Sequence, residues 1–151
     1  MRIKKNLSIL TTLACSLVLS SAAVAEEYRC EVTSYSGALA SLQEGVTNKI
    51  TIVQSWIPTN LTLNNCGLTF EGWGQIPLND NYPKNSLYFA TASFKVDGKT
   101  MRPKYRIHIQ EEVKGYISMK LSSKHKKMGP VPIMCELVQE SPSTCPEQED
   151  Q

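Results

Sequence analysis

Apolar and polar residues alternate along most of the chain, and this period of two predicts β-strands. The clearest example spans 87–96 and leads directly into Asp97-Gly98, a pair typical of two-residue hairpin turns. The alternation stops at Pro103 and resumes over 104–110, so the return strand is expected to be interrupted there. Further strands are expected at 28–35, 49–57, 61–63, 68–70, 116–121 and 131–138.

About seven short strands joined mainly by tight turns predict an all-β fold. The expected architecture is a small antiparallel meander, either closed as a β-barrel or folded as a sandwich. A helix fits at one place, 38–43, and that stretch is short. The strands fall within 26–138, a length that suits a single domain with a core of its own.

The first 25 residues have the pattern of a cleaved export signal. A positively charged start precedes the apolar stretch 7–18, and Ala23-Val24-Ala25 fits the small residues that signal peptidase accepts. The apolar stretch is shorter than the about 20 residues that a membrane-spanning helix needs. We therefore expect 1–25 to be removed, leaving a secreted or periplasmic chain without a transmembrane segment.

Removal of the signal also removes Cys15 and leaves four cysteines. An even number in an exported chain predicts disulfides, because the compartment is oxidising. None of the four has the close spacing of zinc ligands, so neither a metal nor a cofactor is expected. Three connectivities are possible. We favour Cys30–Cys135, since both lie on the apolar side of alternating strands, with Cys66–Cys145 as the second bridge.

Charge is distributed unevenly along the mature chain. Loss of the signal leaves 13 Lys and Arg against 14 Asp and Glu, a net charge of −1, yet 95–127 holds ten cations and three acids. This basic segment predicts a surface for an anionic partner, such as a phosphate-bearing glycolipid, a polysaccharide, a nucleic acid or an acidic secreted protein. The candidate binding residues are Arg102, Lys104, Arg106, Lys120, Lys124, His125, Lys126 and Lys127.

Two plainer interpretations compete with anion binding. The lysines are equally typical of a solvated surface that prevents aggregation between strand edges. Alternatively, the acidic tail 139–151 neutralises the lysines within the same molecule. This tail is expected to be mostly disordered beyond its anchor at Cys145.

The segment 71–86 is long for a loop in a small domain, and such loops are often functional. It holds Trp73 and Tyr82, amphipathic aromatic residues that suit recognition of a sugar or a protein. The alternative is that Trp73 folds inward and plugs one end of the barrel.

No catalytic site is expected. The two histidines, His108 and His125, belong to no recognisable catalytic motif, and oxidised cysteines cannot serve as nucleophiles. We therefore predict a non-enzymatic binding protein that engages an anionic partner through 95–127. The alternatives are an inhibitor of a secreted hydrolase that uses the 71–86 loop, and a carrier with a small hydrophobic ligand inside the barrel.

Overall fold

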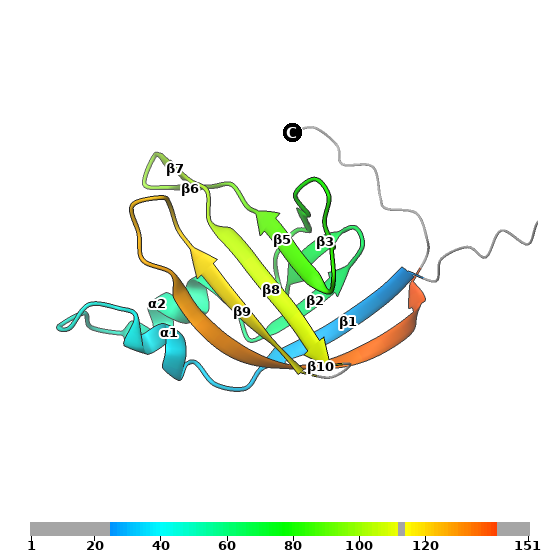
Figure 1. Cartoon of the computed structure of the whole chain (residues 1–151). Coiled ribbons are helices and arrows are strands. Elements are labelled where there is room, and N and C mark those ends of the chain that lie inside the picture. The colour runs from blue at the N-terminus through cyan, green and yellow to red at the C-terminus, as the bar shows by residue number, and fades with distance from the viewer. Residues whose placement is uncertain (1–24, 112–113, 142–151) are drawn as a thin grey trace, which may run out of the picture.

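The structure is a computed structural model that describes residues 25–111 and 114–141 (Figure 1). Its central feature is an eight-stranded antiparallel sheet in the order β4-β3-β2-β1-β10-β9-β8-β5. The predicted all-β fold is confirmed, with eight strands in this sheet instead of about seven. The strands are β1 (Ala25–Val32), β2 (Asn60–Asn64), β3 (Gly67–Phe70), β4 (Ile76–Pro77), β5 (Leu87–Thr91), β8 (Lys104–Glu111), β9 (Lys114–Lys120) and β10 (Met128–Ser141).

The sheet curls until its two edge strands nearly meet, so the fold is a barrel and not a sandwich. Directly after β4, Leu78 forms an isolated bridge with Ala90 of β5. The next amide, that of Asn79, donates a hydrogen bond of 2.7 Å to the carbonyl of Phe89. The β4–β5 seam is therefore closed by a bridge and a hydrogen bond, not by a continuous ladder.

The expected hairpin at Asp97-Gly98 is confirmed. It joins β6 (Phe94–Val96) to β7 (Lys99–Met101), and both turn residues have positive φ values, 51° and 74°. The strand expected over 87–96 is divided into β5 and β6, and Pro103 separates β7 from β8 as the sequence predicts. Figure 1 shows this hairpin projecting beyond the end of β5.

Inward-facing side chains of the strands fill the barrel. Tyr105 of β8 is fully buried, and the small side chain of Ala90 lies directly opposite it on β5, which makes room for the ring. Tyr88 packs edge-to-face on Tyr28 with ring centroids 6.5 Å apart. Burial raises the pKa of Tyr88 to about 12 and also raises that of Tyr105, because the charged phenolate is disfavoured there.

The strand expected at 49–57 is wrong, because this stretch forms helix α2 (Lys49–Trp56). Val53 and Ile57 are fully buried, whereas Ser55, which would share their face in a strand, is exposed. The hydroxyl of Tyr105 donates to the carbonyl of Trp56 at 2.6 Å and so satisfies a group at the helix end. Tertiary packing thus overrides the local β preference of these branched residues.

A second, shorter helix, α1 (Ser36–Ala40), begins two residues before the stretch expected to be helical. It packs against β10, and Figure 1 shows both helices together at one side of the barrel. The approach is close at Gly37, where an added side chain would collide with the backbone carbonyl of Pro130. The described residues contain two helices, α1 and α2, and neither is long and apolar enough to cross a membrane.

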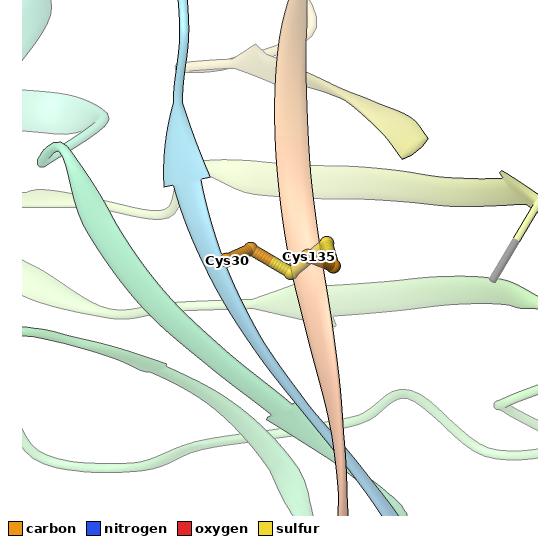
Figure 2. Close-up of a disulfide and its surroundings, with 2 residues drawn as sticks. All are labelled: Cys30 and Cys135. Carbon is orange, nitrogen blue, oxygen red and sulfur yellow. A yellow bond between two sulfur atoms is a disulfide. The ribbon is translucent and has the colours of Figure 1, made fainter. Parts of the chain in front are cut away.

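The predicted disulfide between Cys30 and Cys135 is confirmed. Figure 2 shows it joining β1 to β10, where the two residues are directly opposite each other. Cys66 is disulfide-bonded as well, whereas Cys145, its expected partner, lies outside the described residues. The expected signal peptide, apart from its last residue, also lies outside them. β10 continues to Ser141, three residues into the segment expected to be a tail.

Candidate anion-binding surface

Outward-facing side chains of β5, β8 and β9 form a three-by-three grid with Arg106 at its centre. Arg106 of β8 is paired with Phe89 of β5 on one side and with Ser118 of β9 on the other. Neighbours on the grid are about 7 Å apart along a strand and about 5 Å apart across strands. We call this grid the β5–β8–β9 array; its members are Leu87, Phe89, Thr91, Lys104, Arg106, His108, Tyr116, Ser118 and Lys120.

Three shallow grooves cross the array, and Arg106 lines all of them. The groove that contains the lysines has a volume of about 160 Å³ and is lined by Lys104, Lys120 and Lys127 together with Phe89. A second, of about 410 Å³, continues past His108 and Tyr116. A third, of about 310 Å³, is lined by Tyr82, Lys84, Asn85, Leu87, Arg106 and His108.

The cations of the array are not neutralised within the part of the chain that the structure describes. Lys104 lies directly opposite Lys120 on the neighbouring strand, an arrangement that costs stability for like charges. The ion pair found among the described residues joins Arg29 to Glu27, on β1. Lys104, Arg106, Lys120 and Lys127 are all exposed. An anion bound here would supply the missing counter-charge.

The remaining predicted cations lie near this surface but do not line its grooves. Lys124, His125 and Lys126 are exposed in the loop between β9 and β10. That loop turns through a contact of 2.6 Å between the Ser122 hydroxyl and the His125 ring. The loop ends at Lys127, which lines two of the three grooves of the array. Arg102 is exposed just before β8 and also lies outside the three grooves.

The two aromatic candidates of the 71–86 segment are separated. Tyr82 packs on Phe89 with ring centroids 5.6 Å apart, and so borders the array. Trp73 is half-buried between Phe70 and Phe94, with ring centroids 5.0 Å from each. Phe94 in turn contacts Trp56 of α2. Trp73 therefore belongs to an aromatic cluster at one end of the barrel, as the plug interpretation expects.

Another groove, of about 710 Å³, lies on the outer surface of β3, β2, β1 and β10. Its net charge is of the opposite sign to that of the array, with three glutamates and one arginine among its lining residues. Glu71 accepts a hydrogen bond of 2.7 Å from the Asn60 amide in this region. The two sides of the barrel therefore differ in charge.

Trp73→Ala is expected to lower the free energy of unfolding by about 2 kcal/mol, roughly half the loss for a fully buried tryptophan. The loss arises because Trp73 packs on two aromatic rings while part of its surface stays in water. Retention on a polyanion column should not change, because Trp73 lies outside the array. Denaturant titration and column elution measure the two effects; lost retention in a stable variant would contradict this assignment.

Sequence reasoning missed six of the nine array members as binding residues, and three of the six carry rings: Phe89, His108 and Tyr116. The alternation did place Phe89 and His108 on outward faces, so part of the signal was present. What was absent was the pairing between strands, which brings Phe89 opposite Arg106 and Tyr116 opposite His108.

Within 25–111 and 114–141, no group of three or more potential metal-ligating side chains is close enough to hold an ion. The array itself offers cations, aromatic rings and hydroxyl groups. Comparisons of the chain with protein-family models, with curated proteins and with solved structures gave no significant match.

Proposed function

We propose that this chain is an exported, non-enzymatic binding protein that holds an anionic polymer on the β5–β8–β9 array. The observation that carries the proposal is the convergence of Lys104, Arg106, Lys120 and Lys127 on one groove. Within the described residues none of these cations has an acidic partner. A polymer fits better than a small anion, because the three connected grooves extend across three strands.

The disulfide supports the part of the proposal that places the protein, and so its binding to the polymer, outside the cytoplasm. Structural disulfides are rare in reducing compartments and frequent in secreted and periplasmic proteins. The Cys30–Cys135 bridge, together with the signal-like start of the sequence, therefore favours export.

The composition of the array favours binding over catalysis. Its members are cations, aromatic or aliphatic side chains and two hydroxyl residues, and it includes no carboxylate to pair with His108. In hydrolytic triads such a carboxylate holds the histidine ring in its catalytic orientation and stabilises the imidazolium that forms.

The experiment compares two double charge reversals on a heparin column. Lys104→Glu with Lys120→Glu changes the array, whereas Lys95→Glu with Lys99→Glu makes the same change in net charge on the β6–β7 hairpin. We expect the array variant to lose at least about tenfold in affinity, equivalent to about 1.4 kcal/mol. The hairpin variant should elute close to the wild-type chain.

Retention of the wild-type chain should also fall steeply with salt, since exposed charges are screened over about 8–10 Å at moderate ionic strength. If the two variants elute together, net charge alone governs retention and the array is not the site. If the wild-type chain is not retained at all, the proposed function fails.

A further inference from the structure

We infer that the anionic polymer is an acidic polysaccharide, whose sugar rings lie on the aromatic side chains of the array while its acid groups meet Arg106 and the lysines. The inference rests on the proposed function and names its ligand class. The evidence for a sugar is the set of aromatic and neutral polar side chains beside the cations, which the argument from charge does not explain.

Aromatic rings flank Arg106 on two sides. Phe89 is its direct partner on β5, with Tyr82 packed on that ring, and Tyr116 lies diagonally across on β9. The Tyr116 side chain is 42% exposed although it is large and lies on a strand inside the sheet. A ring with an apolar body and a hydroxyl at its edge suits the faces and hydroxyls of a sugar.

Neutral hydrogen-bonding groups fill the remaining positions along the grooves. Ser118 lies beside Arg106, Gln110 lies beyond His108, and Asn85 borders the groove near Tyr82. Hydroxyl and amide groups both donate and accept hydrogen bonds, as sugar hydroxyls do. The surface therefore places rings and neutral polar groups beside its cations.

The spacing of the cations favours a polymer of moderate charge density over a nucleic acid. Duplex DNA carries one charge per about 1.7 Å of its axis, and a single one of its strands carries one per about 3.4 Å. The cations of the array lie about 5–7 Å apart: Lys104 is opposite Lys120 and next to Arg106 along β8, whereas the β9 position opposite Arg106 is the neutral Ser118. A chain with about one acid group per sugar ring matches this pattern more closely.

A lipid bilayer is a poorer match. Residues that anchor a protein to a membrane surface bury apolar side chains in the headgroup region. Phe89 is instead half-buried, lines the same groove as the lysines and has Tyr82 packed on its ring, so little of it is free to enter a bilayer.

Arg106 has a particular role in this arrangement. Its planar guanidinium presents a fork of donors that matches a carboxylate or a sulfate in a bidentate manner, which a lysine cannot do. Since Arg106 lines all three grooves, it contacts the polymer wherever the chain crosses the array.

The first part of the test compares ligands for the mature chain at one ionic strength. The probes are polygalacturonate, heparin, a single-stranded oligodeoxythymidine and vesicles of phosphatidylglycerol with phosphatidylcholine. We expect at least one of the two polysaccharides to bind about tenfold more tightly, per site, than the oligonucleotide and the vesicles.

The second part uses variants that keep the charge. Arg106→Lys should weaken binding to the preferred polysaccharide about tenfold, because the fork is lost while the charge remains. Tyr116→Ala should weaken it several-fold without changing the salt dependence, since no charge is removed. The matched controls, Arg29→Lys and Met134→Ala, change exposed residues on the acidic side of the barrel and should bind as wild type does.

The outcomes separate the two proposals. If no polyanion binds, the proposed function fails and this inference with it. If a polyanion binds but the oligonucleotide or the vesicles bind as tightly, the array is an anion site without sugar recognition. Unchanged affinity in both Arg106→Lys and Tyr116→Ala leads to that same conclusion. Thermal unfolding of each variant confirms that these exposed substitutions leave the fold intact.

Discussion

Replacing Cys30 and Cys135 together by alanine is expected to lower the free energy of unfolding by about 4 kcal/mol. The two residues are 105 positions apart, so the disulfide closes a long loop and restricts the unfolded chain. In the chain-entropy model a loop of about 100 residues is worth about 4.7 kcal/mol. Both side chains are buried, and alanine leaves no hydroxyl or thiol without a partner. Denaturant titration measures the loss.

The double variant is a sharper test than chemical reduction. Cys66 is also disulfide-bonded, so a reductant would break more than the β1–β10 bridge. Reduction of the double variant should then measure how much the Cys66 disulfide adds to the free energy of unfolding. A loss below about 1 kcal/mol would mean that the unfolded chain is already restricted by other means.

Phe70→Ala is expected to cost about 3–5 kcal/mol, the usual range for a large aromatic side chain removed from a core. Phe70 is fully buried, and its ring centroid lies 5.2 Å from that of Tyr105 and 5.0 Å from that of Trp73. Its removal opens a cavity that these rings cannot fill without leaving their other contacts. The midpoint of denaturant unfolding should fall with little change in slope.

Phe70→Leu is the matched control, because it keeps most of the volume and should cost less than about 1.5 kcal/mol. Equal losses in the two variants would show that the site relaxes to fill the space. In that case the aromatic cluster does not determine the packing at this end of the barrel.

Much of the barrel wall was predictable because each strand buries one face. Alternation alone put Tyr105 and Ile107 inside and Arg106 outside, and it put Cys30 and Cys135 on inner faces, from which their pairing followed. The stretch 49–57 was mispredicted, since its branched residues favour strands locally. The helix is favoured by contacts with residues far away in the sequence, namely the packing that buries Val53 and the hydrogen bond from Tyr105.

The candidate site was predictable in part for a related reason. Charge along the chain marked Lys104, Arg106 and Lys120, and their strands carry them to one face. The position of Phe89 depends on how β5 pairs with β8, which a single sequence does not specify. The inward packing of Trp73 depends likewise on Phe94, a residue of a separate hairpin.

The pairing of β1 with β10 has a consequence for the order of events during synthesis. The first and last strands of the described chain are neighbours, and β10 lies between β1 and β9 in the sheet. The sheet therefore lacks a strand in its middle until β10 has left the ribosome. Before that point the two halves of the barrel, β1–β4 and β5–β9, have no ladder between them. Contacts this distant in sequence form late and slowly. The growing chain therefore cannot complete its sheet until β10, the last strand of the described residues, has been made.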